Sequence, residues 1–381
     1  MKRRSWPWLA GIAIVTAGCI FFLSSRFLPS VASASDFNPR NFRLLGTVIE
    51  LIKYDYVEEP DPAKTMDGAF RGLVDSLDVL STYLDPARAI KYRQSRKVPF
   101  TDVGAVLIKA YGGFPEVVGL VGGSPAEKGG LKLGDYISSI NNRSTYGLSL
   151  IETQLALKSQ VARPVKVKVL RQNQTLFLTL DRTLLYGKPA TYSPAKGTAG
   201  IVHVQTLRAP CVEETQKILQ ARLKGQSLPL VLDLRNCNEG DLEETRRFLN
   251  LFIKTDKAGV FLKRKAAEEV LSCPQTAPWS RVPLVVWTNL GTQGQAEIAA
   301  GVLQDFGRAK VVGLTTAGLT ASTKILPLED GSALVLTTGV FSLNSGKKIW
   351  GQGVKPDGEV PFKDPGGDPY LKKTLELVST R

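Results

Sequence analysis

Several residue types that common enzyme sites need are scarce in this sequence. It has a single His in 381 residues, so zinc sites built on paired histidines are excluded. Its four Cys are well separated, which excludes a CxxC redox pair, a Cys-rich zinc site and a dense disulfide scaffold. No GxxxxGKS or GxxxxGKT run occurs, so a P-loop nucleotide enzyme is excluded as well. The sequence therefore carries no signal for a metal or an organic cofactor.

The overall composition is that of a folded, multidomain protein. Hydrophobic residues make up 43% of the chain and aromatic residues 8%, which is enough for a hydrophobic core and excludes wholesale disorder. At roughly 100–200 residues per domain, the length predicts two or three domains.

The first 34 residues have the pattern of an export signal. Lys2, Arg3 and Arg4 precede an apolar run that ends at Leu23, and residues 32–34 (Ala-Ser-Ala) offer a cleavage site. From Trp6 the run has 18 residues, close to the lower limit of roughly 17–25 residues for a spanning helix. A cleaved signal peptide and a retained membrane anchor both stay open, and the apolar residues after Cys19 disfavour a lipoprotein. The pattern predicts an extracytoplasmic location, in the periplasm or cell envelope.

The net charge of the chain stays positive when residues 1–34 are left out. The formal charge is +14, and without the four basic residues of 1–34 it is 45 − 35 = +10. A solvated basic surface is one interpretation, and an adaptor for anionic envelope polymer or lipid is another. The basic residues are scattered and form no arginine-rich arm, so no nucleic-acid partner is predicted. Cys211, Cys237 and Cys273 lie beyond the signal and could give one disulfide or only buried thiols.

Residues 41–95 are expected to be helical. Apolar residues recur at helical spacing in two runs, one around Leu44–Ile52 and the other around Met66–Leu77, and Pro60 and Pro62 separate them. Two short amphipathic helices cannot form a core alone, so they should cover another domain or a partner chain. A homo-oligomer is therefore a possible assembly.

Residues 98–182 change to short apolar strands separated by glycine pairs. Val165, Val167 and Val169 alternate with lysines, as in a half-buried strand. Together with the run SPAEKGGLKLGD at 124–135, this region resembles a PDZ domain. In that family a glycine loop before a strand binds the terminal carboxylate of a peptide, which then extends the sheet edge. The resemblance places that loop, and hence peptide binding, at Val103, Gly104, Ala105 and Val106. The alternative is a β-module that serves only for packing.

Residues 199–381 alternate strands and helices, which implies a parallel or mixed sheet covered by helices. Strands are predicted at 201–204, 230–234, 284–287 and from 311, and helices at 212–223, 242–252 and 296–306. A hairpin is predicted between 324–328 and 333–338. His203 lies in the first of these strands, where we expect it to have no chemical role.

An ordered set of motifs gives this region a specific resemblance. The motifs are LDLR at 232–235, AEI at 296–298, QDFGRA at 304–309, VG at 312–313 and GQGVKPD at 351–357. With the PDZ-like insert before them, they resemble the C-terminal processing peptidases, or tail-specific proteases, over residues 41–360. The resemblance implies a multidomain α/β fold, with a crotonase-like core, an inserted PDZ-like β-domain and a helical N-terminal segment. The expected boundaries are 1–34 for the signal or anchor, 35–97 for the helical segment, 98–182 for the PDZ-like domain and 183–381 for the core.

Members of that family are exported serine peptidases with a Ser–Lys dyad, and this chain departs from the dyad at both positions. Anchored on Glu297, the position of the nucleophile holds Gly294. Anchored on Gly318, the position of the general base holds Leu319. Glycine has no side chain to attack with, and leucine has no lone pair to accept a proton. A third departure is Glu239, which replaces one glycine of the pair that helps form the oxyanion hole in relatives, and its charge would oppose an oxyanion.

The remaining polar candidates are weaker. A relocated dyad could combine Thr292 or Ser322 with Lys310 or Lys324, but we expect these to be ordinary polar residues. By resemblance Asp305 lies near the site, where a structural hydrogen bond is expected. Asp233 and Arg235 are expected to fix the corner between strand and loop through hydrogen bonds.

The sequence thus predicts an exported pseudoprotease with no catalytic residues of the family kind. It would bind protein or peptide C-terminal tails, or act as scaffold or regulator of an active paralogous protease. The alternative is an active serine or threonine peptidase with a relocated dyad that cleaves C-terminal tails.

Overall fold

The computed structural model describes residues 39–110, 112–185, 187–195, 198–222, 229–361 and 368–379. The predicted export segment at 1–34 lies outside the described residues. The chain divides into two compact units, Met1–Met66 and Asp67–Arg381. Among the helices that are described, none is both long and apolar enough to cross a membrane.

The first unit is helical where it is described. Helix α2 spans Pro39–Asp55 and has no buried residue. Its apolar side chains Phe42, Leu44 and Leu51 are exposed, which is the pattern of a helix that presents its apolar face outward. Helix α3 spans Pro62–Asp75, so it begins in the first unit and ends in the second. Both helices match the runs predicted from periodicity.

The PDZ-like domain is a β-sheet with two short helices. The strands lie in the order β2 (Ala105–Ile108), β3 (Glu116–Leu120), β4 (Tyr136–Ile140), β6 (Val165–Arg171) and β7 (Gln174–Leu180), and β5 (Arg143–Ser144) pairs with β4. Helices α5 (Pro125–Lys128) and α6 (Leu150–Leu157) complete it. The alternating valines of β6 are buried together with Leu107, Ile137 and Leu157 in one cluster. Strand β2 is an edge of this sheet, as peptide addition requires.

A six-stranded sheet forms the centre of the α/β core. Its order is β17 (Gly358–Glu359), β14 (Lys310–Gly313), β13 (Leu284–Thr288), β10 (Leu230–Asp233), β9 (Ala199–Val204) and β8 (Ala190–Ala195). All neighbours are parallel except β8, which is antiparallel to β9. Helices α7 (Cys211–Arg222), α8 (Leu242–Leu249) and α9 (Gln295–Asp305) pack on one face, and α10 (Pro369–Ser379) packs on the other.

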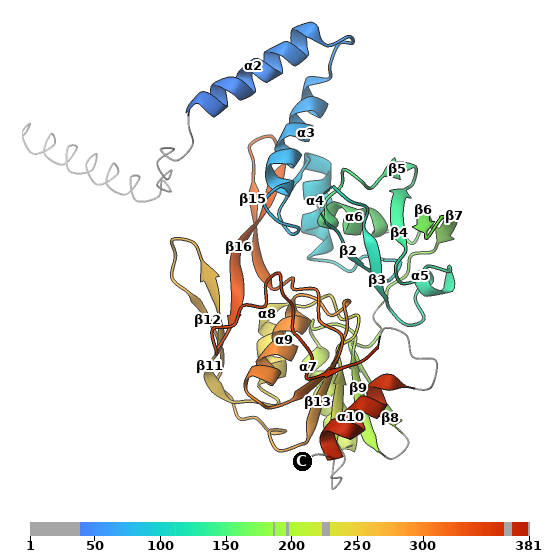
Figure 1. Ribbon diagram of the computed structural model, residues 1–381, viewed down its shortest axis with the longest axis vertical. Coiled ribbons are helices and arrows are strands. Elements are labelled where there is room, and N and C mark those ends of the chain that lie inside the picture. Colours follow the sequence, from blue (N-terminus) through green and yellow to red (C-terminus); the bar gives the residue numbers. More distant parts are fainter. Residues whose placement is uncertain are drawn as a thin grey trace, which may run out of the picture. The chain divides into compact units, whose positions relative to one another are not determined.

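A second, antiparallel sheet has the order β1 (Thr82–Leu84), β16 (Ala333–Leu343), β11 (Thr255–Lys263) and β12 (Glu269–Cys273), and β15 (Ala321–Pro327) also pairs with β16. Helices α8 and α9 lie between the two sheets (Figure 1). The predicted hairpin is confirmed by the pairing of β15 with β16.

Strand β1 differs from the expectation that residues 41–95 are helical throughout. Tyr83 and Leu84 are almost fully buried, and β1 pairs with β16 about 250 residues later in the chain. Only helix α4 (Pro86–Ser95) resumes the helical pattern, with Asp85 as its N-cap. A three-residue strand whose partner is distant in sequence leaves no local periodicity to detect.

Candidate functional site

The two positions that lack the family's reacting groups are brought together by the core. Gly294 is the N-cap of α9, with a φ of 58°, and it follows the carboxyl end of β13. A Cβ atom built on Gly294 would meet only one atom within 4 Å, the carbonyl oxygen of Leu319 at 3.9 Å. A Cβ at position 294 would therefore make only an ordinary van der Waals contact with Leu319, although the positive φ strains any residue other than glycine.

One buried carboxylate holds this arrangement. Glu297 lies in the first turn of α9 and accepts hydrogen bonds from the backbone N–H groups of Gly294 at 2.9 Å and Leu319 at 2.7 Å. It also accepts from the hydroxyl of Thr316 and from the N–H of Gly318. Burial raises the pKa of Glu297, and these four donors oppose that rise. Glu297 thus fixes positions 294 and 319 relative to each other.

The side chain of Leu319 makes apolar contacts. Its side chain packs against the buried hydrophobic cluster of the PDZ-like domain. It also lines a cavity of about 430 Å³ together with Ile108, Leu150 and Trp350. Residue 319 therefore joins the core to the PDZ-like domain through hydrophobic burial.

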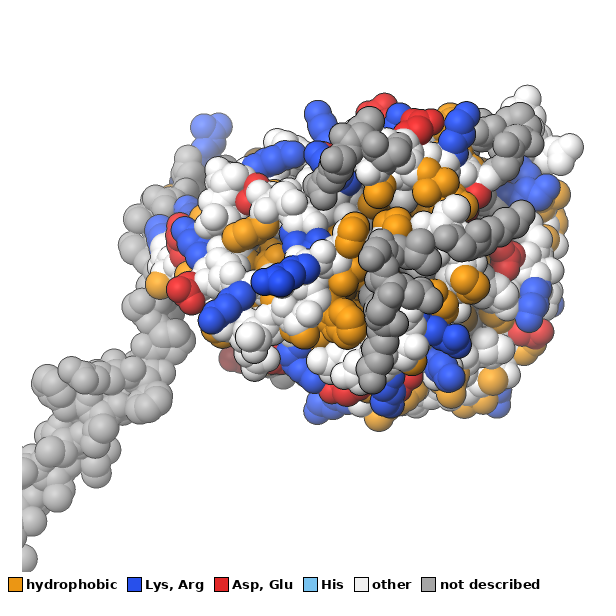
Figure 2. Space-filling model, turned by 90° about the horizontal axis from the view of Figure 1, so that it is seen from below, with side chains coloured by type: hydrophobic (Ala, Val, Ile, Leu, Met, Phe, Trp, Pro, Cys, Tyr) orange, Lys and Arg blue, Asp and Glu red, His pale blue; other side chains and the backbone are white. Residues whose placement is uncertain are grey.

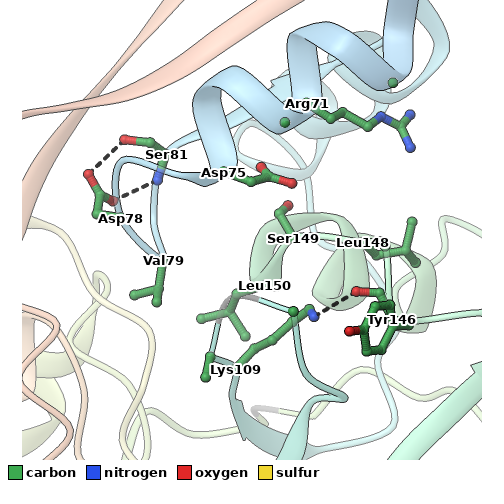
Figure 3. Close-up of a pocket in the computed structure, with 15 residues that line it drawn as sticks. Arg71, Asp75, Asp78, Val79, Ser81, Lys109, Tyr146, Leu148, Ser149 and Leu150 are labelled. Carbon is green, nitrogen blue, oxygen red and sulfur yellow. Dashed lines mark hydrogen bonds between the residues drawn. The ribbon is translucent and has the colours of Figure 1, made fainter. Parts of the chain in front are cut away.

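A second cavity, of about 460 Å³, shares residues with the Leu319 cavity. Figure 3 shows the carboxylate of Asp75 facing the hydroxyl of Ser149, and the ammonium of Lys109 directed at the carbonyl of Tyr146, 3.1 Å away. Burial, with a contribution from Glu152, raises the pKa of Asp75 to about 6. Burial also lowers the pKa of Lys109. The cavity therefore contains both a carboxyl and an amine that are poorly solvated.

Glu239 lies in a cluster of charges between the core and the PDZ-like domain. Lys158, just after α6, forms an ion pair with Glu239 and lies 3.5 Å from a carboxylate oxygen of Asp102. Arg208 approaches Glu239 from the core side at 3.5 Å. Burial alone would raise the pKa of Glu239, but the ammonium of Lys158 outweighs it and holds that pKa below its usual value. The carboxylate that was expected to disfavour an oxyanion thus anchors the PDZ-like domain.

The predicted peptide-binding loop is already hydrogen-bonded within the chain. The N–H of Val103 donates to Asp102 Oδ1 at 2.6 Å, and the N–H of Gly104 lies 3.4 Å from the same oxygen. Gly104 has a φ of 84°, and a Cβ there would come within 2.4 Å of Ser124 Cβ, so only glycine fits this turn. Ala105 and Val106 begin the edge strand β2. The carboxylate of Asp102 therefore occupies donors that the resemblance assigns to a peptide terminus.

The groove beside this loop is narrow. Gly104, Ala105 and Val106 line a cavity of only about 50 Å³, and its opposite wall includes Asn238 and Glu239 of the core. The amide of Asn236 further ties the two parts by donating to the carbonyl of Leu120 at 2.9 Å. A peptide could enter this groove only if the PDZ-like domain moved away from residues 236–240.

Two of the residues considered for a relocated dyad, Thr292 and Lys310, bind other partners. The Thr292 hydroxyl is buried and donates to the carbonyl of Leu234 at 2.8 Å. Lys310 pairs with Asp357 at 3.1 Å, and Lys324 is exposed on β15. Within the described ranges, no hydrogen bond joins Thr292 or Ser322 to either lysine.

Other expectations about single residues can be compared directly. Arg235 donates to both carboxylate oxygens of Asp233, at 2.8 and 2.7 Å, as expected for the corner after β10. Asp305 accepts from the N–H of Ser345 at 3.0 Å, which confirms a structural hydrogen bond. The three cysteines Cys211, Cys237 and Cys273 are buried and free.

His203, for which no chemical role is expected from the sequence, has a polar neighbour at each ring nitrogen. Its Nε2 is 2.7 Å from Ser193 Oγ, and its Nδ1 is 2.9 Å from Asp233 Oδ2. Ser193 was not among the residues singled out from sequence. The three residues lie on neighbouring strands, and nothing in the sequence fixes the pairing of β8 with β9 or of β9 with β10.

The surface charge is dispersed. Figure 2 shows Lys and Arg side chains spread over the visible face among apolar and acidic ones, with no continuous basic strip. On that face, the distribution favours the solvated basic surface over a polyanion-binding patch.

Comparisons with known proteins agree with this architecture. Residues 198–360 match the family model of peptidase family S41, and residues 116–171 match that of a PDZ domain. The chain is 26% identical over 362 residues to the carboxy-terminal processing protease CtpA of Bacillus subtilis, covering 94% of this chain and 77% of the relative. It is 27% identical over 351 residues to the carboxy-terminal-processing protease of Bartonella bacilliformis, covering 88% and 80%. The solved photosystem II D1 C-terminal processing protease has the same fold, with a TM-score of 0.70, 24% identity and coverage of 88% and 90%.

Proposed function

We propose that this chain, a homologue of the carboxy-terminal processing proteases that joins a peptidase family S41 domain to a PDZ domain, is a pseudoprotease that binds peptide C-termini. The observation that carries the proposal is the pair Gly294–Leu319. Glu297 holds the two positions face to face, and neither residue can attack a carbonyl or accept a proton. Loss of a nucleophile from a serine hydrolase costs on the order of a millionfold in turnover.

Peptide binding is the activity that such a chain could retain. Strand β2 is a sheet edge, and Gly104 keeps the turn that a carboxylate-binding loop needs. Asp102 already lies against that loop, so a peptide carboxylate would have to displace it. Binding would therefore be coupled to release of the contacts that Lys158 makes with Glu239. A scaffold or regulator of an active paralogue could use this coupling to report that a tail is bound.

We also propose that the protein is exported. The basic start, apolar run and Ala-Ser-Ala site of residues 1–34 support it. The tails bound would then be those of extracytoplasmic proteins, and the N-terminal segment would either be removed or tether the protein to the membrane.

Cleavage by the full-length chain is the first test. We would incubate it with an unstructured protein such as casein and follow the products by mass, beside a Gly294→Ser, Leu319→Lys double variant. The natural chain should give no products above buffer. The matched controls are Gly294→Ala and Leu319→Met, which fill the same positions without reacting groups. Cleavage by the natural chain that disappears in Thr292→Ala would instead establish a relocated nucleophile.

Peptide recognition needs a separate measurement. A fluorescent peptide with a free C-terminal carboxylate should bind, and the same peptide with a C-terminal amide should not. Glu239→Gln keeps the size of the side chain and removes the charge that pairs with Lys158, so it should tighten binding several-fold. Equal binding of the free and amidated peptides would contradict recognition through this loop. Binding that ignores the terminus and is lost in added salt would indicate an adaptor for anionic polymer.

A further inference from the structure

A hydrogen-bonded series of Ser193, His203 and Asp233 crosses three adjacent strands of the central sheet. His203 is directly opposite Asp233 on β10 and diagonal to Ser193 on β8, so all three side chains project from one face. Ser193 Oγ is 2.7 Å from His203 Nε2, and His203 Nδ1 is 2.9 Å from Asp233 Oδ2. With the proton on Nδ1, the ring donates to the aspartate and accepts from the serine hydroxyl. These are the distances and roles by which a Ser–His–Asp triad is recognised, whatever the chain order.

The surroundings of the series keep it oriented. Asp233 is buried, and Arg235 donates to both of its oxygens. The guanidinium of Arg235 lies over the adjacent rings of Trp287 and Tyr370, with its central carbon 4.8 and 4.5 Å from their centroids. Burial alone would raise the pKa of Asp233, but hydrogen bonds from Arg235 and His203 hold it below its usual value. Asp233 is thus ionised and fixed, as the orienting member of a triad must be.

Two members of the series, His203 and Asp233, line a cavity of about 540 Å³, and Ser193 lies behind them without lining it. His203, Asp233 and Arg235 line it, and so does Thr191, two residues before Ser193 on the same face of β8. The side chain of His203 is 35% exposed, so the imidazole is accessible. Leu120 and Leu133 of the PDZ-like domain supply apolar lining, and Gln205 supplies an amide. His203 and Asp233 lie toward the carboxyl ends of parallel strands, where open α/β sheets place their ligands.

This cavity is separate from the Gly294–Leu319 site. Ile201 and Val231, which share the face of the series, pack with α10. Helix α9, which carries Gly294 at its start, packs on the opposite face of the same sheet. Chemistry at Ser193 therefore does not depend on the vacated dyad.

We propose that Ser193 is an activated nucleophile, with His203 as its general base, and that it accepts acyl groups from small activated esters. Ser193 Oγ attacks the acyl carbon while its proton passes to His203 Nε2. The bond to the leaving phenolate breaks, and the phenolate takes that proton. Water then attacks the acyl-serine, releasing the acid and restoring the serine hydroxyl, so that ester and water give acid and phenol.

The substrate class follows from Arg235. Asp233 shares its negative charge with a guanidinium, so it stabilises a developing imidazolium less than an unpaired aspartate would. Such a triad suits leaving groups that need little protonation, such as phenolates, and it does not suit the amine of a peptide bond. The inference concerns ester chemistry and is independent of the proposed binding of tails.

Covalent labelling of the full-length chain tests this directly. A dialkyl fluorophosphate should add one dialkylphosphoryl group, with fluoride as the leaving group, and peptide mapping should place it on Ser193. The adduct should be absent in Ser193→Ala and should form about 100-fold more slowly in His203→Gln, the scale of general-base assistance. Ser322→Ala, the matched serine control, should label like the natural chain. Hydrolysis of p-nitrophenyl acetate should change in parallel across the three variants.

Two results would overturn the proposal. The first is that the dialkyl fluorophosphate leaves the Ser193 peptide unlabelled under conditions in which it labels a known serine hydrolase. The other is an adduct that forms as fast in His203→Gln as in the natural chain, because that would mean His203 does not activate the serine. Thermal melting of each variant establishes that the fold is intact. Neither outcome bears on peptide binding, which the amidated-peptide comparison decides separately.

Discussion

The Gly294–Leu319 site and the Asp102–Lys158–Glu239 cluster differ in what their polar side chains bind. At the first, the positions that would react hold a hydrogen and a hydrocarbon, and the one buried carboxylate, Glu297, serves only to hold backbone. At the second, two carboxylates and an ammonium, all partly buried, meet between the core and the PDZ-like domain.

The difference shows what each region has to maintain. At the Gly294–Leu319 site, backbone hydrogen bonds to Glu297 and the packing of Leu319 maintain the shape. A domain contact that must open for a ligand benefits from charges, because ion pairs that separate are stabilised by water. Under the proposed function, release of the charged contact would open the groove beside Gly104 to a peptide.

The largest effect should come from Glu297→Ala. This change leaves four buried donors without an acceptor, so the free energy of unfolding should fall by about 3–5 kcal/mol. Denaturant unfolding followed by circular dichroism measures it. Glu297→Gln keeps one acceptor oxygen and should lose less. A loss below about 1 kcal/mol in the alanine variant would mean that Glu297 does not hold the site.

Lys158→Met tests the charged contact. It leaves the partly buried carboxylates of Asp102 and Glu239 without their shared cation, and the free energy of unfolding should fall by about 1–3 kcal/mol. The exposed pair of Lys217 with Glu214 offers a control, because Lys217→Met should change the unfolding midpoint little. Equal effects of the two substitutions would show that the cluster contributes no more than a surface pair.

The pH dependence of stability should differ between the two regions. Asp75 has a folded pKa of about 6, above its ordinary 3.8, so its contribution to stability is complete below pH 3.8 and is lost as the pH rises to about 6. Asp75→Asn should therefore stabilise the protein at pH 7.5 by about 1–3 kcal/mol. Glu239 has a lowered pKa, so its contribution is lost as the pH falls below its ordinary 4.5, and Glu239→Gln should flatten that acid limb. Thermal melts from pH 3.5 to 8 check both, and an unchanged profile in either variant would contradict the assigned cause.

Leu319→Ala should have a moderate effect. Its side chain is partly buried against the PDZ-like cluster, so the free energy of unfolding should fall by about 1–2 kcal/mol. Leu319→Met conserves volume and should be close to neutral. Chemical denaturation checks the pair, and a neutral alanine variant would argue that residue 319 does not connect the two domains.

Gly294→Ala should have the smallest effect. The φ of 58° disfavours a Cβ by about 1 kcal/mol, but no atom other than the Leu319 carbonyl lies within 4 Å of it. Gly104→Ala, also at positive φ, adds a clash with Ser124 and should cost clearly more. Unfolding midpoints of the two variants compare them directly. A larger loss at Gly294 would show that the space for a nucleophile has closed.

Much of the architecture follows from patterns that are local in the sequence. Periodicity located α2, α3 and α9, alternation located β6 and β9, and Glu329–Ser332 marked the turn between β15 and β16. Ordered motifs identified positions 294 and 319 without any structure, because the chain around them keeps the family's spacing. Strand β1 escaped detection, since its partner lies far along the chain.

The sequence alone predicts that positions 294 and 319 lack reacting groups, because a comparison of motif spacing needs no coordinates. Only the tertiary structure decided what the remaining polar groups do. Glu239 meets Lys158 across the contact between two domains, and Ser193 reaches His203 across a pair of strands. The register of strands and the docking of domains place these side chains within a few ångströms, and both depend on packing of the whole chain.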